Sequence, residues 1–389
     1  MGVIILSILL LVIPGQTPEV VREADSFFQR GVERQQLGDA AGAQQFYEQV
    51  LRLMPKRLDA LSNLGVVYSR QGMHDKAIAR YREALAIAPG EQRIRLNLGI
   101  ACFQIKNYRA AIDELAQVVS AYPDLAQARL LLGICLFESG ELVAAIEHLE
   151  AVYRTQPGNV AIAYTLASAY LKSARFEKVA EMIGTVFRDP VSAEARVIRG
   201  AYAVAQKRAD LALEELRAAV RLNPMLPTAH AQLGGAWLLL GNREAAVAGY
   251  EAELRVNPEN YDAVSRLGWL YREDGRLAEA EPLLRRALTI KPGDPGLLYQ
   301  LGRLLTSQGQ NSTALPLIEQ LVSLVPEYRP ARVLLARIYF RLERNSEARR
   351  EQATLARLTA EQLKRDRPVT PNRPFDQLLP DATERERPE

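Results

Sequence analysis

Residues 58–89 read LDALSNLGVVYSRQGMHDKAIARYREALAIAP, which is two short helical patterns separated by a glycine turn. Leu61, Leu64 and Tyr68 recur at helical spacing in the first half, and small and aromatic residues recur from Ala77 to Ala84 in the second half. The closing proline ends the second pattern, because its ring clashes with the preceding turn and it donates no amide hydrogen bond. The stretch therefore predicts a helical hairpin that needs neighbours to cover its apolar face.

The same pattern recurs along the chain with a period of 34 residues, shortened once to 33. One register consists of prolines at positions 55, 89, 123, 157, 190, 224, 258, 292 and 326. A second register holds Gly or Ala at positions 31, 65, 99, 133, 167, 200, 234, 268, 302 and 336. A third holds Ala or Val at positions 43, 77, 111, 145, 179, 212, 246, 280, 314 and 348. All three registers lose one residue between Val179 and Pro190, so the sequence predicts one continuous array of about ten hairpins.

The period and its residue pattern resemble the tetratricopeptide repeat over about residues 24–360. The resemblance implies an all-α fold, a right-handed superhelical solenoid of about ten helix-turn-helix repeats, whose first helices line a concave groove. Small residues such as Gly65 would let paired helices approach closely, and turn glycines such as Gly72 would adopt positive φ.

Some repeats depart from the pattern. Repeat one carries arginines at positions that are apolar in repeat two, as an end cap requires. Repeat five has Val179 and Ala174 in place of the usual alanine and turn glycine, so we expect a hinge or a change of twist there. Pro282 in repeat eight and Pro316 in repeat nine are expected near the first turn of a second helix, where proline is tolerated.

Three segments are predicted: a signal peptide or N-terminal anchor over 1–23, the repeat solenoid with its C-terminal capping helix over 24–365, and a disordered Pro-rich tail over 366–389. The apolar run at 3–13 is shorter than the ~20 residues that span a bilayer and resembles the apolar part of a secretory signal. No basic residue precedes the run, and the cleavage site is poor, so an uncleaved anchor and a misassigned start codon stay open.

Composition narrows the functional classes. The 389-residue chain has 48% hydrophobic residues, which excludes wholesale disorder, and a net charge of +3, which argues against general nucleic-acid binding. Cys102 and Cys135 lie in successive first helices and are predicted to be buried core thiols, with a bridge or a reactive thiol as the alternative.

No pattern for catalysis stands out. His74, His148 and His230 fall at different places in different repeats, and the sequence contains no H-E-x-x-H, Gly-rich phosphate loop or nucleophile elbow. We therefore predict no enzymatic activity, no metal and no cofactor. An enzyme with a site assembled across repeats stays a distant alternative.

The resemblance implies that a ligand binds to first-helix positions outside the apolar core of each repeat. In repeats three to six these positions are apolar and include Leu96, Ile100, Phe103, Leu130, Ile134, Phe137, Tyr164, Leu171, Val197 and Val204. In repeats eight to ten they are basic and aromatic and include Arg266, Trp269, Arg272, Tyr299, Arg303, Arg337, Phe340 and Arg341. The apolar set predicts a binding patch, with packing between adjacent first helices as the alternative.

The Lys and Asn residues with which some family members grip a C-terminal carboxylate are not matched here. The corresponding positions hold Ser62, Asn63, Val66, Arg93, Leu96 and Asn97.

The interpretation is a non-catalytic scaffold that binds a peptide or protein segment, exported to the periplasm or secreted, with membrane anchoring by residues 3–13 as the alternative. A second interpretation is an assembly or regulatory subunit of an envelope secretion or polysaccharide-export complex. Phe375, Leu378 and Leu379 in the tail have the spacing of a helix that occupies a groove in cis, against which a plain disordered tail is the alternative.

Overall fold

The computed structural model describes residues 17–188 and 191–365, with side chains as far as Glu361. The predictions for the apolar run at 3–13 and for the tail at 366–389 lie outside the described residues. The described ranges contain twenty α-helices and no strand. The helices are α1 Pro18–Gln36, α2 Ala40–Leu53, α3 Leu58–Arg70, α4 His74–Ile87, α5 Gln92–Gln104, α6 Tyr108–Ala121, α7 Ala126–Glu138, α8 Leu142–Thr155, α9 Val160–Lys172, α10 Phe176–Gly184, α11 Ala193–Ala205, α12 Ala209–Leu222, α13 Ala229–Leu239, α14 Arg243–Val256, α15 Tyr261–Glu273, α16 Leu277–Ile290, α17 Pro295–Ser307, α18 Asn311–Leu324, α19 Arg329–Arg341 and α20 Asn345–Arg365.

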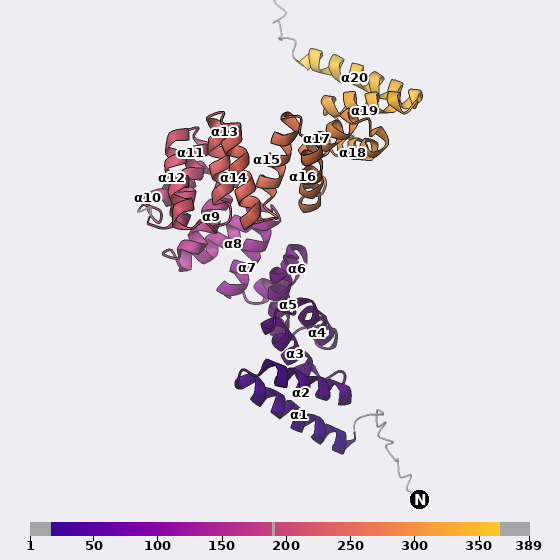
Figure 1. Cartoon of the computed structure of the whole chain (residues 1–389). Helices are drawn as coiled ribbons and strands as arrows, with labels where there is room; N and C mark the ends of the chain where they lie inside the picture. Colours follow the sequence, from indigo (N-terminus) through magenta and orange to yellow (C-terminus); the bar gives the residue numbers. More distant parts are fainter. Residues whose placement is uncertain (1–16, 189–190, 366–389) are drawn as a thin grey trace, which may run out of the picture. The chain divides into compact units, whose positions relative to one another are not determined.

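Successive helices pair into hairpins along the chain (Figure 1), ten in all. By their internal contacts the helices divide into two compact units. Unit 1 ends at Leu226 and contains α1–α12, and unit 2 begins at Pro227 and contains α13–α20. Within each unit the second helix of one hairpin packs on the first helix of the next, as α6 does on α7 and α18 does on α19. This order is the solenoid arrangement that the period predicted, because a hairpin's apolar face is covered only by its neighbours.

The small-residue register permits this close pairing. A Cβ added at Gly65 would lie 2.5 Å from Cε1 of Tyr81, and one added at Gly200 would lie 2.5 Å from Cγ of Leu216. The predicted turn glycines adopt positive φ, as at Gly72 with +74°. In repeat five Ala174 adopts φ +57° at the same place, a conformation that costs an L-residue more than glycine.

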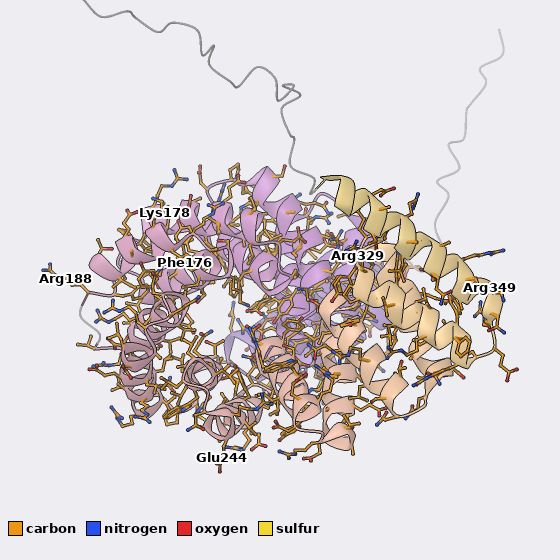
Figure 2. The ribbon with its side chains drawn as sticks, turned by 90° about the horizontal axis from the view of Figure 1, so that it is seen from above. Phe176, Lys178, Arg188, Glu244, Arg329 and Arg349 are labelled. Carbon is orange, nitrogen blue, oxygen red and sulfur yellow. The ribbon has the colours of Figure 1, made fainter. Side chains whose placement is uncertain are left out.

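Repeat five is irregular, as the shortened period predicted. Its second helix α10 has nine residues, whereas α8 and α12 each have fourteen. The first helices that precede and follow α10 in the chain, α9 and α11, contact each other directly. Lys178 on α10 and Arg188 just after it are exposed (Figure 2). The division between units falls after repeat six, not here, and a hinge at repeat five stays a prediction.

The expected place of two prolines was wrong. Pro282 is the sixth residue of α16, and Pro316 is the sixth residue of α18. Both lie in the second turn, where a proline removes one backbone hydrogen bond. Both are exposed. The helices continue through these positions to Ile290 and Leu324.

One buried carboxylate lies in the core of unit 2 and was not anticipated. Glu253 replaces the apolar residue (Ala, Val or Leu) found at this second-helix position in other repeats, such as Ala84, and has an exposed fraction of 0%. Its side chain accepts hydrogen bonds from the backbone N–H of Thr228 at 2.7 Å and of Ala231 at 3.2 Å, and from the amide of Asn260 at 2.9 Å. The charge therefore lies at the N-terminus of α13, where the helix dipole stabilises it.

Cys102 and Cys135 are free thiols buried in the core of unit 1, as predicted. Burial raises the pKa of the Cys135 thiol to about 12. Because the thiolate is the reactive form, both cysteines act as small apolar core residues.

Candidate ligand-binding face of the first helices

The predicted site residues separate between the two units. We call one set the apolar face of unit 1, which lies on α5, α7 and α9: Leu96, Ile100, Phe103, Leu130, Ile134, Phe137, Tyr164 and Leu171. We call the other set the basic face of unit 2, which lies on α15, α17 and α19: Arg266, Trp269, Arg272, Tyr299, Arg303, Arg337 and Arg341. The sequence predicted one groove, whereas the two sets belong to two different units of the structure.

The apolar face is shared between core and surface. All eight of its side chains are half-buried, and all except Ile100 pack against the core of unit 1. Val197 of the wider predicted set is 2% exposed, so it is a core residue and the expectation that it lines a groove was wrong. The reason is that first helices in adjacent repeats contact one another, as α5 and α7 do, and cover part of each other's inward side.

Phe137 and Phe103 also have neighbours on the surface. The Lys172 ammonium lies 4.6 Å from the centroid of the Phe137 ring, and the Phe103 and Tyr108 rings lie 6.1 Å apart. Lys172 was not predicted, because it comes from the next repeat and no pattern within one repeat indicates it. A cation over an aromatic ring contributes on the order of 0.5–1 kcal/mol at exposed sites.

Arg272 is the most unusual residue of the basic face. Its side chain is 12% exposed, and its carboxylate partner is Glu273. Its Nε is buried and, within the described residues, has no hydrogen-bond partner. Burial lowers the pKa of the Arg272 guanidinium; Glu273 opposes this shift and Arg303 adds to it. A buried guanidinium with an unused donor is costly, because its desolvation is incompletely compensated.

The other arginines of the basic face remain in solvent. Arg266, Arg303, Arg337 and Arg341 are exposed. The Arg341 guanidinium also donates to the backbone carbonyl of Thr306 at 2.9 Å, which ties α19 to α17.

Aromatic rings lie between these cations. Tyr299 meets Tyr328 edge to face with 5.4 Å between ring centroids, and the Arg303 guanidinium lies 5.7 Å from the Tyr299 ring. The Trp269 ring has the Arg243 guanidinium 5.6 Å from its centroid. Tyr328 and Arg243 were missed from the sequence because they come from neighbouring segments. Together these residues form an arginine-rich surface with planar rings, which suits carboxylates and extended chains.

Comparison with known families supports the repeat interpretation. Family models of the tetratricopeptide repeat match residues 22–90, 57–124, 96–160, 136–192, 238–295 and 305–366. The chain belongs to the tetratricopeptide-repeat family. No curated protein matches it.

Among solved structures, a chain in the crystal structure of the APC/C hetero-tetramer Cut9-Hcn1 is similar, with a TM-score of 0.51 and 15% identity over 88% of this chain and 82% of that one. The crystal structure of MamA protein matches 52% of this chain and 97% of its own, with 23% identity and a TM-score of 0.38. At such identities the likeness to Cut9-Hcn1 shows the fold alone.

A tyrosine–glutamate pair joins several tetratricopeptide repeats and was not predicted. A tyrosine near the end of a first helix donates to a glutamate twenty residues earlier, on the second helix of the preceding repeat. The four hydroxyl–carboxylate distances are 3.0 Å for Tyr68–Glu48, 2.6 Å for Tyr170–Glu150, 2.5 Å for Tyr271–Glu251 and 2.7 Å for Tyr339–Glu319. The equivalent positions without tyrosine, such as Cys102 and Leu305, have no glutamate twenty residues earlier. This co-occurrence is the signal by which the sequence alone could have indicated the pair.

Burial and the partner carboxylate raise the pKa of Tyr68, Tyr271 and Tyr339 to about 12. The hydroxyl groups are therefore protonated donors at neutral pH. The pairs fasten successive repeats together in both units and have no evident part in ligand binding.

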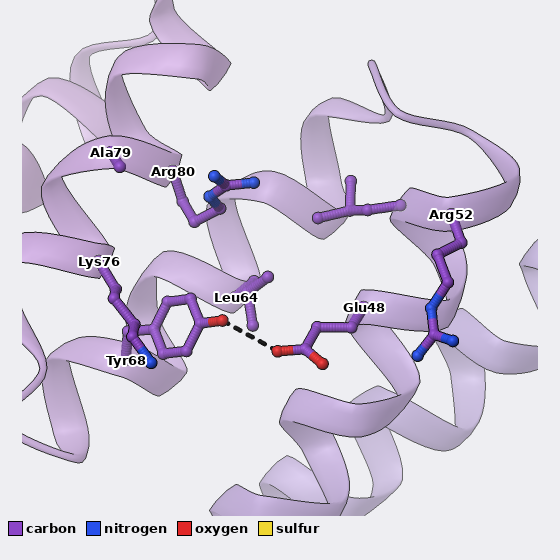
Figure 3. Close-up of a pocket in the computed structure, with 8 residues that line it drawn as sticks. Glu48, Arg52, Leu64, Tyr68, Lys76, Ala79 and Arg80 are labelled. Carbon is purple, nitrogen blue, oxygen red and sulfur yellow. Dashed lines mark hydrogen bonds between the residues drawn. The ribbon is translucent and has the colours of Figure 1, made fainter.

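A shallow pocket in unit 1 is built on one of these pairs (Figure 3). Its lining residues are Glu48, Leu51, Arg52, Leu64, Tyr68, Lys76, Ala79 and Arg80. The Tyr68 hydroxyl donates to Glu48 across it, and no predicted site residue lines it. The pocket is thus a gap between α2 and α4 beside a structural contact.

The described ranges contain neither a metal-binding cluster nor a membrane-spanning helix. No group of three or more His, Cys, Asp or Glu residues is placed there to hold a metal ion. None of the helices in those ranges combines the length and the apolar composition of a membrane span.

Proposed function

We propose that this tetratricopeptide-repeat protein is a non-catalytic scaffold that holds a protein or peptide segment on its first-helix faces, with an acidic stretch bound to the basic face of unit 2. The observation that carries the proposal is Arg272. Its buried Nε has no partner in the described residues, and Arg303 lies close enough to lower the pKa of Arg272 further. A bound carboxylate would add negative charge beside Arg272 and Arg303, in addition to that of Glu273.

The rest of the basic face supports the same ligand class. Arg266, Arg303 and Arg337 are exposed on three successive first helices, so their charges can follow an extended acidic segment. Trp269 and Tyr299 are half-buried beside them. Aromatic residues and arginines are the types that contribute most to binding at protein interfaces.

The apolar face of unit 1 would take an apolar part of the ligand, at Phe103, Phe137 and Tyr164. Most of this face packs against the core of unit 1, which leaves its side chains half-buried. We further propose that the protein acts in a cell envelope, on the basis of the apolar run at 3–13, with an assembly subunit of an envelope complex as the second candidate.

The two tryptophans provide a direct test of acidic binding. Trp237 and Trp269 are the two tryptophans of the chain, so Trp237→Phe leaves Trp269 as a fluorescent reporter within the basic face. Peptides selected from a random displayed library by the full chain should be rich in Asp and Glu and should change Trp269 emission. Arg303→Ala should weaken their binding by up to about fivefold at low salt, as expected for an exposed charge pair, and less at high salt.

Arg285→Ala is the matched control, because Arg285 is an exposed arginine of the same unit on the second helix α16, paired with Glu281. It should leave the affinity unchanged. Selection of peptides without acidic residues, or equal losses for both variants, would contradict the proposal.

A further inference from the structure

The first helix of the last hairpin exposes apolar side chains. On α19, Val333 is 47% exposed and Phe340 is 69% exposed. They are seven residues apart and therefore lie on one face of the helix, with Arg337 between them. We call these three residues the exposed edge of α19.

The equivalent positions one repeat earlier are covered. Tyr299 on α17 corresponds to Val333, and its ring packs on the ring of Tyr328 with 5.4 Å between the centroids. Thr306 corresponds to Phe340, is 4% exposed, and its carbonyl accepts a hydrogen bond from Arg341. In the described residues no hairpin follows α20, so the surface that each repeat normally offers to the next is open on α19.

The last hairpin carries a large excess of positive charge. Residues 329–365 contain ten basic and four acidic residues, a net charge of +6, whereas the whole chain has +3. A second copy of the chain would bring two such surfaces together, and like charges oppose that pairing. A covering segment should therefore be acidic as well as apolar.

The chain carries such a segment directly after α20. Residues 366–389 contain six acidic and four basic residues, a net charge of −2. Within them Phe375, Leu378 and Leu379 have the i, i+3, i+4 spacing with which a short helix presents one apolar face. We propose that residues 375–379 pack in cis on the exposed edge of α19, with Phe375 beside Val333 and the leucines beside Phe340.

The distances allow this. The Arg329 guanidinium donates to the carbonyl of Leu358, so α20 passes the start of α19 at that point. At 1.5 Å per residue, the end of α20 lies about 10 Å beyond Leu358, and Val333 lies about 6 Å along α19 from Arg329. When extended, residues 366–374 can span up to about 30 Å. This length is enough for the two distances along the helices and for the separation of about 10 Å between the axes of two packed helices.

The inference does not depend on the proposed function, because it concerns a contact within one chain. The docked segment would cover Arg337, which is also a residue of the basic face of unit 2.

Disulfide trapping in the full chain tests the contact without altering its apolar residues. Arg337→Cys combined with Gln377→Cys should form an intramolecular disulfide in most molecules under mild oxidation. Arg303→Cys with Gln377→Cys is the matched control, since Arg303 is the equivalent exposed residue one repeat earlier. The control should form several-fold less. Equal yields for both pairs, or a disulfide that forms only between two chains, would overturn the proposal.

Hydrogen exchange provides a second measurement that needs no cysteine. Deletion of 366–389, and separately the triple change Phe375→Ser, Leu378→Ser and Leu379→Ser, should speed amide exchange in α19 several-fold and leave α17 unchanged. If α19 exchanges at the same rate in all three proteins, the segment does not cover it. Addition of the peptide 366–389 to the deleted chain should restore protection only at high peptide concentration, because linkage raises the effective concentration.

Discussion

Phe137 of unit 1 and Arg272 of unit 2 occupy the same place in their repeats, four residues after the register glycine at Gly133 and at Gly268. Both are half-buried. Phe137 joins the core of unit 1 there, whereas Arg272 keeps a charge and an unused donor. One repeat position thus holds an apolar contact with the core in one unit and a largely buried charge, paired with Glu273, in the other.

The comparison shows why repeat position alone does not define a binding face. An apolar residue at this position gains from burial by the next helix, so its presence needs no ligand to explain it. An arginine there gains only from burial of its aliphatic stem, and the desolvation of its guanidinium opposes that gain. The basic face of unit 2 is therefore the stronger candidate site, although the sequence presents the two sets in the same way.

The largest expected effect is the loss of the Phe137 ring. Phe137→Ala should lower the stability of unit 1 by about 2 kcal/mol, less than the roughly 3–5 kcal/mol of a fully buried Phe because the ring is half-buried. Chemical denaturation followed by circular dichroism measures it, beside a titration with a selected peptide. A large loss of stability with unchanged affinity would show that the apolar face is packing between repeats. Lost affinity with unchanged stability would show that it is a binding surface.

A smaller effect is expected at the tyrosine–glutamate pairs, which occur in both units and should behave alike in each. Tyr271→Phe removes the hydroxyl that donates to Glu251 and should cost about 1 kcal/mol, as a typical hydrogen bond does. Tyr68→Phe in unit 1 should cost the same. Tyr122→Phe is the control, since Tyr122 is 55% exposed, and should cost almost nothing.

These pairs also predict a loss of stability at high pH. The folded pKa of Tyr68, Tyr271 and Tyr339 is raised to about 12, above the ordinary value of 10.0. Between these values the unfolded chain loses tyrosine protons that the folded chain retains, so stability is complete below pH 10 and decreases as the pH rises toward 12. The three Tyr→Phe changes together should flatten this decrease. A decrease of the same steepness in the triple variant would refute the assignment.

The smallest change in stability is expected at Arg272. Arg272→Met keeps the length of the side chain and removes a poorly compensated charge, so stability should stay equal or rise by up to about 1 kcal/mol. Binding of an acidic peptide should weaken by more than it does in Arg303→Ala. A marked loss of stability would mean that Arg272 and its ion pair with Glu273 have a structural role instead of a ligand role.

Much of the architecture was predictable from the sequence because its determinants are local. The glycine at position 72 sets a turn, the alanine and glycine registers set how closely paired helices approach, and each proline ends a hairpin. Repetition at 34 residues multiplies this information, so about ten hairpins and an irregularity in repeat five were predicted, whereas the shortening of α10 to nine residues was not. The site was less predictable. The sequence gives the residue types on the first helices, but it does not give how far each side chain is exposed.

The sequence by itself determined the family, the hairpins and the contrast between apolar and basic first helices, since all of these depend on residue type and spacing along the chain. Only the tertiary structure decided that Val197 is core, that Glu253 is buried at the start of α13, and that Arg272 has an unused donor. It also placed the two faces in separate units, divided after Leu226. The physical reason is that burial and charge compensation depend on side chains from neighbouring repeats, and no pattern within one repeat contains that information.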